Sequence, residues 1–272
     1  MTFRISGFGS TPVDKKTVMP AYRPEKETIS PRKSVVQVRF PGRGMALSYY
    51  NDQFDLKVGD LVYVDGKLEG QLGHITDVNY NFKIKISEYK KVIAVVDTEV
   101  HGQFFAAGSH FVTFDVATLP MEQISMWFKA PVKEGEVYVS GNDDTSFRLD
   151  DLKGMNITSA IAERGHKYFM ENRVRYICLN DAQGYAIVEG NESYTIEFEY
   201  HNGEISHLVC DCPCSYNCKH EFAAMLQLRE MLEIIDKHYP EEFQRTGYFA
   251  AITKGTLFAF AVDGKETGSF TL

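Results

Sequence analysis

Four of the five cysteines in this 272-residue chain lie within nine residues, and a histidine follows closely: Cys210, Cys212, Cys214, Cys218 and His220. Thiolate sulfur and imidazole nitrogen are ligands that Zn²⁺ prefers, whereas Ca²⁺ and Mg²⁺ prefer oxygen. Three thiolates and one imidazole fill a tetrahedral zinc and leave no coordination position for a substrate. The cluster therefore predicts a closed zinc site with a structural role.

The preferred ligand set is Cys210, Cys212, Cys218 and His220, spaced Cys-x-Cys-x5-Cys-x-His. Cys210 follows an apolar, strand-like run. Alternate residues of a strand point to the same side, so Cys210 and Cys212 are expected to face together. Cys214 is an alternative ligand in place of Cys210. A disulfide is disfavoured because the two cysteines of a Cys-x-Cys pair seldom meet the geometry of a bridge.

The same stretch resembles the SWIM zinc-binding domain, whose pattern is Cys-x-Cys-xn-Cys-x-His. Cys210–Pro213 and Cys218–His220 stand as in that family, and an apolar, alanine-containing helix follows at 221–226. The chain departs from the family in an extra cysteine and a very short loop. The resemblance implies a zinc-organised domain that interacts with DNA or with other proteins. It covers residues 157–232, with similar upstream stretches at 162–168, Val174, 186–190 and 194–196.

The part of the chain that precedes this domain contains short β-rich runs separated by glycine turns, which predicts a small antiparallel β-barrel. The run from Val58 to Ile75 resembles the strand pairs of SH3-like barrels, such as KOW-type translation domains. The segment 82–86 alternates apolar and charged residues and is expected to be a strand. The other strands expected in this region span 35–40, 45–50, 56–64, 72–78 and 91–96.

The region that carries the cysteines is expected to combine a sheet with a helix. A helix at 158–165 should end at Gly165, and a long helix should cover 219–237. The tail is expected to form a β-hairpin from strands at 248–252 and 256–262. The other elements expected here and in the middle of the chain are a helix at 121–128 and strands at 111–116, 136–140, 173–179, 185–189, 194–200 and 205–209.

The predicted fold class is therefore mainly β with α+β character. An N-terminal small antiparallel β-barrel is followed by an α+β SWIM zinc-binding domain. We expect three parts, a basic extended arm at 1–34, a β-rich barrel-like region at 35–150, and a SWIM-type zinc domain with a C-terminal β-hairpin at 151–272.

Composition narrows the class of protein. Hydrophobic residues make up 44% of the chain and charged residues 24%, a normal globular balance, and no apolar run reaches the length of a membrane span. The polar start at Met1–Arg4 and the clustered cysteines predict a cytoplasmic protein without a membrane partner. Neither a phosphate-binding glycine loop nor a nucleophile elbow occurs, which favours a non-enzymatic adaptor. There are two alternatives. One is an enzyme whose site lies between the domains, and the other is a thiolate-based redox sensor.

Charge is unevenly distributed along the chain. Residues 1–43 carry nine basic and three acidic residues, a net charge of +6, whereas residues 145–272 carry 12 basic and 19 acidic residues, a net charge of −7. The acidic, cysteine-bearing region favours a protein partner. The basic front allows DNA or RNA as a partner through phosphate contacts, with Tyr49, Tyr50 or Tyr63 as candidates for stacking on bases.

Any nucleic-acid binding should therefore reside in residues 1–100 and should weaken steeply with salt, because each phosphate contact releases counterions. A salt titration of single- and double-stranded DNA and RNA against residues 1–100 and 150–272, made separately, measures this. Tight, salt-resistant binding by residues 150–272 alone would contradict the interpretation of the charge asymmetry.

Overall fold

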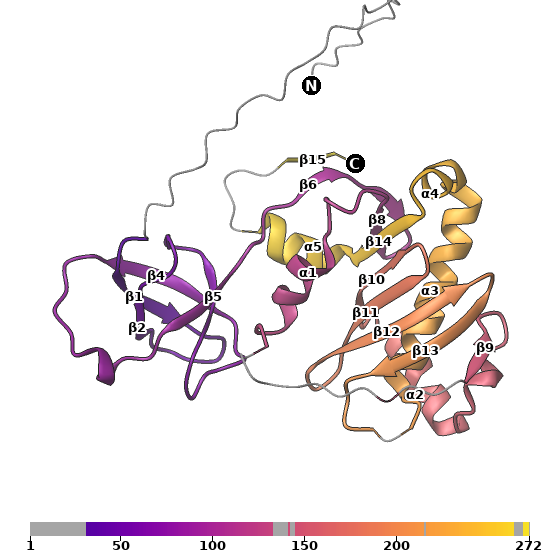
Figure 1. Ribbon diagram of the computed structural model, residues 1–272, viewed down its shortest axis with the longest axis horizontal. Helices are drawn as coiled ribbons and strands as arrows, with labels where there is room; N and C mark the ends of the chain where they lie inside the picture. The colour runs from indigo at the N-terminus through magenta and orange to yellow at the C-terminus, as the bar shows by residue number, and fades with distance from the viewer. Residues whose placement is uncertain (1–30, 133–140, 142–144, 215, 264–268, 272) are drawn as a thin grey trace, which may run out of the picture.

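The computed structural model describes residues 31–132, 141, 145–214, 216–263 and 269–271. In this part of the chain two antiparallel sheets dominate and a few helices accompany them, so a mainly β fold with α+β character is confirmed. Figure 1 shows the smaller sheet at one end of the molecule and the larger sheet at the other, with α1 (Met121–Phe128) and α5 (Lys254–Leu257) between them. Most of the expected basic arm lies outside the described residues.

The smaller sheet contains five of the six strands expected for the barrel-like region. All its neighbouring strands are antiparallel. A single bridge between Tyr50 and Lys91 connects its two edges, and a closed barrel stays a prediction. In spatial order the strands are β2 (Leu47–Asn51), β1 (Ser34–Arg39), β4 (Gly73–Asn79), β3 (Leu61–Val64) and β5 (Val92–Val96).

The strand expected at 82–86 does not form, and that prediction is wrong. Phe82 and Ile84 are half-buried between exposed lysines, so the alternation marks a segment with one buried side. The ring of Phe82 packs edge-on against Tyr50, with centroids 6.2 Å apart. A strand also needs a hydrogen-bonded neighbour, and alternation along one segment says nothing about whether a neighbour is present.

The larger sheet draws its eight antiparallel strands from distant parts of the chain. Its strands β7, β8 and β9 come from residues that the sequence analysis grouped with the barrel-like region, and the division into domains stays a prediction. The strand expected at 136–140 lies outside the described residues. In spatial order the strands are β7 (Phe105–Ala107), β8 (His110–Thr113), β14 (Tyr248–Thr253), β10 (Val174–Asn180), β11 (Gln183–Glu189), β12 (Ser193–His201), β13 (Glu204–Cys210) and β9 (Ser146–Arg148).

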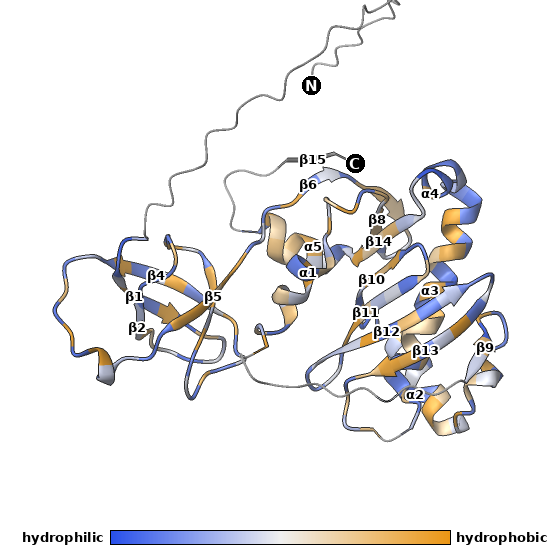
Figure 2. Cartoon of the chain, viewed as in Figure 1, coloured by the Kyte–Doolittle hydropathy of each residue, from blue (hydrophilic) through white to orange (hydrophobic). Residues whose placement is uncertain are grey.

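The two faces of this larger sheet cover different cores, because successive strand residues point to opposite sides. One face, which includes Ile177, packs against α2 (Ser159–Met170) and α3 (Lys219–His238). The other face, which includes Tyr176, packs against α1 through Trp127 and reaches the smaller sheet. Figure 2 shows the apolar residues that line the strands and one side of α3. The larger sheet is thus the middle layer of the molecule.

The remaining elements are short. Strands β6 (His101–Gln103) and β15 (Ser269–Thr271) pair in parallel, and α4 (Pro240–Thr246) follows α3. Two 3₁₀ helices span Ile86–Glu88 and Leu152–Met155. Within the described part of the chain, no helix combines the length and the apolar character needed to cross a membrane.

The three tyrosines suggested for base stacking are core residues. Tyr49, Tyr50 and Tyr63 are 5%, 2% and 1% exposed, respectively, so their ring faces are covered by protein. Tyr63 also donates its hydroxyl proton to the carbonyl oxygen of Met126 at 3.0 Å, which ties the smaller sheet to α1. The suggestion that these rings stack on nucleic-acid bases is therefore wrong.

Gly165 does not end a helix. Helix α2 continues to Met170, and Gly165 is buried within it where α2 packs on α3. A β-carbon at this position would lie 2.8 Å from Cδ1 of Phe222 and 2.9 Å from the carbonyl oxygen of Lys219. The close approach of the two helices explains the glycine, and the predicted helix end is wrong.

The prediction of a second strand in the C-terminal hairpin is also wrong. Strand β14 is present, but helix α5 follows it and continues into a π-helix at Phe258–Val262. The hydroxyl of Thr253 caps α5 by accepting the N–H of Thr256 at 3.4 Å. Phe260 stacks on Trp127 with ring centroids 4.9 Å apart. Packing in the core thus overrides the strand preference of the aromatic residues in this tail.

The Gly165→Ala variant tests how closely α2 and α3 cross, because two effects would change the free energy of unfolding in opposite directions. Helix propensity alone would stabilise the protein by about 0.5–1 kcal/mol. Overpacking against Phe222 should instead destabilise it by about 1–3 kcal/mol, and we expect this effect to win. The matched control is Gly255→Ala in α5, where a β-carbon meets no atom within 4 Å. Denaturant unfolding of both variants measures the difference, and a more stable Gly165→Ala protein would contradict the crossing.

Candidate metal centre

The cysteine-rich segment connects β13 of the larger sheet to the start of α3. Strand β13 ends at Cys210, and Cys212 follows two residues later. Cys218 is the N-cap of α3 and His220 lies in the first turn of that helix. The structure therefore brings two candidate ligands from a strand end against two from a helix start.

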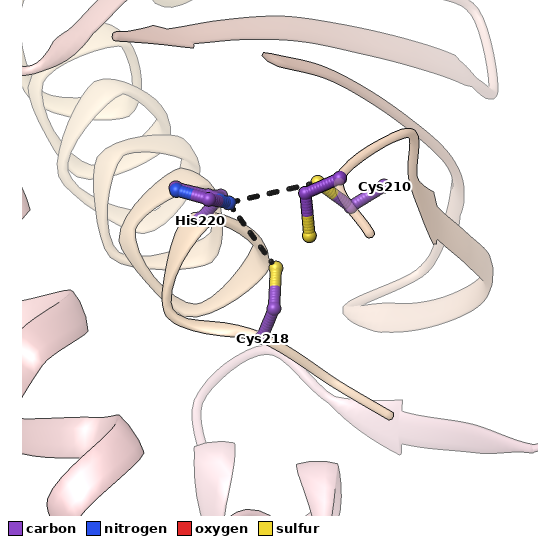
Figure 3. A group of neighbouring side chains, drawn as sticks. Cys210, Cys218 and His220 are labelled. Carbon is purple, nitrogen blue, oxygen red and sulfur yellow. Dashed lines mark hydrogen bonds between the residues drawn. The ribbon is translucent and has the colours of Figure 1, made fainter. Parts of the chain in front are cut away.

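The four candidate ligand atoms converge on one point. The sulfur atoms of Cys210, Cys212 and Cys218 and a ring nitrogen of His220 all lie within 4.8 Å of one another. Nδ1 of His220 is 3.6 Å from Sγ of Cys218 and 3.9 Å from Sγ of Cys210, and Figure 3 shows these three side chains pointing toward one another. Ordinary Zn–S and Zn–N bonds in a tetrahedron place ligand atoms about 3.5–3.8 Å apart. Small side-chain rotations would therefore close this group around a zinc ion.

Helix α3 begins with a capping box in which cysteine takes the usual place of serine or threonine. Sγ of Cys218 accepts the N–H of Glu221 at 3.5 Å, and the carboxylate of Glu221 accepts the N–H of Cys218 at 2.6 Å. Burial, and then the neighbouring Cys218 thiolate, raise the pKa of Glu221 to about 8. The box fixes the helix start and sets the sulfur at the positive end of the helix dipole, which favours a thiolate.

Asp211 fixes the turn between the first two cysteines. Its carboxylate accepts the backbone N–H of Thr195 at 2.9 Å and also the hydroxyl of that residue. The same carboxylate forms an ion pair with Lys129, which directly follows α1. The segment that presents Cys210 and Cys212 is thereby tied both to β12 and to the end of α1.

His220 is held between aromatic rings. Tyr194 stacks on its imidazole with centroids 4.3 Å apart and planes 21° from parallel, and Tyr168 approaches at 5.5 Å. The Nε2 atom is buried and has no hydrogen-bond partner among the described residues. A β-carbon on Gly190 would lie only 3.2 Å from Nε2, so glycine makes room for the ring. This packing directs Nδ1 toward the three sulfur atoms.

The three thiols differ in how strongly they hold a proton. The pKa of Cys218 is lowered to about 4. The main cause is the hydrogen bond from Cys210, and contacts from His220 and the backbone of Glu221 add to it. The same bond to Cys218, together with burial, raises the pKa of Cys210 far above its ordinary range. Burial raises the pKa of Cys212 to about 12. Among the three thiols, Cys218 thus loses its proton most readily.

The two other cysteines stand apart from this group. Cys214 is exposed and does not belong to the set of converging ligand atoms. Cys178 is buried on the opposite face of the larger sheet, in the core shared with α1. The preferred set from the sequence is thus the set that converges, and the role of Cys214 as a ligand stays a prediction without support from this geometry.

Sequence reasoning did not single out Glu221, Tyr194 or Gly190. The spacing of Cys218 and Glu221 carries a capping-box signal, which is easily overlooked when cysteine replaces serine. No local signal marks Tyr194 and Gly190, because they flank the β11–β12 turn and meet His220 only through the tertiary fold.

No protein-family model, no curated protein and no solved structure matches this chain.

Serine substitutions should separate the two candidate ligand sets. Cys210→Ser removes a converging sulfur and should lower zinc affinity by at least about tenfold, because serine is a poor zinc ligand. Cys214→Ser serves as the matched control and should leave affinity unchanged. Competition with a chromogenic chelator measures both. Loss of zinc by Cys214→Ser with retention by Cys210→Ser would establish the alternative set.

Zinc binding should also be linked to pH. Ligand thiols bind as thiolates, so the protons of Cys210 and Cys212 must leave, and affinity should rise with pH and fall as the solution is acidified. Near neutral pH we expect protons to be released when zinc binds, because the thiols of Cys210 and Cys212, whose pKa values are raised, must ionise to become ligands. Calorimetry in two buffers of different ionisation enthalpy measures the number of protons released. Release of no protons would be inconsistent with thiol coordination.

Proposed function

We propose that Cys210, Cys212, Cys218 and His220 bind one Zn²⁺ ion with a structural role. The observation that carries this proposal is the convergence of three thiols and one imidazole nitrogen within 4.8 Å. Soft sulfur ligands select zinc over Ca²⁺ or Mg²⁺. Four protein ligands fill the tetrahedron, so no position remains at which the ion would activate water or a substrate.

The position of the site explains what the ion would do for the fold. It would cross-link the end of β13 to the start of α3, the helix that covers one face of the larger sheet. Ala223, Ala224 and Leu228 of α3 are fully buried in that core. Structural zinc sites contribute on the order of 10 kcal/mol to folding. The metal would therefore fix where α3 begins and how it lies on the sheet.

We further propose that the region around the metal is a SWIM-type module that binds a protein partner. The loop between the second and third ligands presents Tyr216, whose side chain is 88% exposed. Lys219 follows shortly after it in the sequence and lies over the ring of Tyr168, 4.8 Å from the centroid. Arg173 lies over the same ring at 4.9 Å. Tyrosine and arginine are enriched at protein interfaces. The net charge of −7 over residues 145–272 disfavours a nucleic-acid partner here.

Nucleic-acid binding is the second candidate function, through the basic front of the chain. The net charge of +6 over residues 1–43 favours it. In the described part of this region, Arg32 lies 4.2 Å from the ring centroid of Tyr80, which is 37% exposed. Tyr80, which follows β4, is thus a partly exposed ring in contact with this region, whereas the tyrosines first considered are buried.

Metal analysis and thermal unfolding test the structural role. Purified protein should contain about one zinc per chain. Removal of zinc should lower Tm by at least ~10 °C, since each 1 kcal/mol corresponds to about 2–4 °C in a chain of this size. Added zinc should restore Tm, whereas added Mg²⁺ should not. An unchanged Tm after complete removal of zinc would refute the structural role.

Partner capture from native cytoplasm tests the interaction role. Wild-type protein, Cys218→Ser and Tyr216→Ala should be compared with and without nuclease treatment. We expect a protein partner that survives nuclease and is lost with either variant. Tyr80→Ala is the matched control for an exposed tyrosine outside the metal region. Loss of the partner on nuclease treatment would favour the second candidate function instead.

A further inference from the structure

A cavity lies on the face of the larger sheet opposite the cysteine cluster. Its volume is about 350 Å³, within the range of small-ligand pockets. Tyr185, Tyr248 and Cys178 line it, and all three belong to the core on the α1 side, whereas the metal ligands adjoin the core on the α3 side. Val116 and Met121 stand at its opening, 56% and 36% exposed. The cavity is therefore separate from the candidate metal centre.

Strand pairing fixes the lining residues relative to one another. Cys178 pairs with Tyr185, which in turn pairs with Glu197 on the next strand. On the other side, Asn180 pairs with Tyr248. Side chains held by neighbouring strands of one sheet are more precisely placed than side chains on loops. The cavity is thus preformed by the sheet.

Both tyrosine hydroxyls have hydrogen-bond partners within the protein and keep oxygen lone pairs that can accept. Tyr248 donates to the carbonyl oxygen of Leu119 at 3.3 Å. Ser125 donates to the carbonyl oxygen of Met121 at 2.7 Å, and its hydroxyl also lies 3.0 Å from the hydroxyl of Tyr185. Burial raises the pKa of Tyr185 to about 12, so this hydroxyl stays neutral.

The charged residues that line the cavity are both acidic. Glu122 and Glu197 line it, and none of its ten lining residues is lysine, arginine or histidine. The carboxylate of Asp115 adds to the negative potential at Tyr248. A cavity rich in acceptors and carboxylates, with tyrosine rings and apolar groups at its opening, attracts a donor-rich cation and repels an anion.

We propose that this cavity binds an organic cation, a guanidinium or alkylammonium group carried on an apolar stem. The head group would donate hydrogen bonds to Glu122 and Glu197 and to the tyrosine oxygens, and the stem would pack against Val116 and Met121. Such a group occurs both on free alkylamines and alkylguanidines and on arginine or lysine side chains of a peptide. The two sources share the head-group chemistry and differ in what surrounds it.

The test is a titration of the full, zinc-loaded chain with butylguanidine, followed by calorimetry and by the NMR signal of the Gly184 amide, which lines the cavity. Butylurea is the matched neutral ligand with nearly the same shape. An acetylated and amidated Gly-Arg-Gly peptide presents the same head group on a polypeptide. Glu122→Gln and Glu197→Gln remove one charge each at exposed positions, and Glu163→Gln on the exposed side of α2 is the matched control.

We expect butylguanidine to bind in a 1:1 ratio and each cavity variant to weaken it by about tenfold, as the loss of one charge-assisted contact implies. Butylurea should not bind, and Glu163→Gln should behave as wild type. Tighter binding of the peptide would identify a polypeptide as the source of the cation, and its exclusion would identify a free small molecule. Equal binding of butylurea, no binding of butylguanidine at millimolar concentration, or indifference to both cavity variants would overturn the proposal.

Discussion

The end of a strand of the larger sheet and the start of the helix that covers it meet at one cluster of sulfur and nitrogen atoms. Strand β13 brings Cys210 and Cys212, and α3 brings Cys218 and His220, to within 4.8 Å. The pKa values of Cys210 and Cys212 are raised and that of Cys218 is lowered, so the three thiols do not ionise alike. A bound divalent cation would favour the thiolate form of all three. The surrounding contacts, from the capping box to Asp211, all hold the ligands in place for such an ion.

The layers of the molecule can be followed outward from this cluster. Helix α3 begins at the cluster and packs along one face of the larger sheet, and α2 crosses it so closely that Gly165 has no room for a β-carbon. The other face remains free to receive α1 and the smaller sheet, which meet it through Tyr176, Trp127 and Tyr63. One sheet thus separates the core beside the cysteine cluster from a second core that borders an acidic, tyrosine-lined cavity.

The amino-acid sequence was a good guide where the signal is local. Ligand type and spacing identified the group that converges, and helical and strand periodicity placed α1, α3 and most strands of the larger sheet within a few residues. It failed where the deciding contact is distant in the chain. Gly165 resembles a helix end until Phe222 is seen against it, and the aromatic tail after Thr253 resembles a strand until Phe260 is seen on Trp127. The stack of Tyr194 on His220 and the cavity have no local signal at all.

The most direct test of the central claim is zinc X-ray absorption on the purified protein, because it reports the atoms bonded to the ion. We expect three sulfur neighbours at about 2.3 Å and one nitrogen at about 2.0–2.1 Å. Cys210→Ser should reduce the number of sulfur neighbours to two, or release the metal. A shell of oxygen neighbours, or three sulfurs that persist in Cys210→Ser, would contradict the assignment of the ion to this junction of strand and helix.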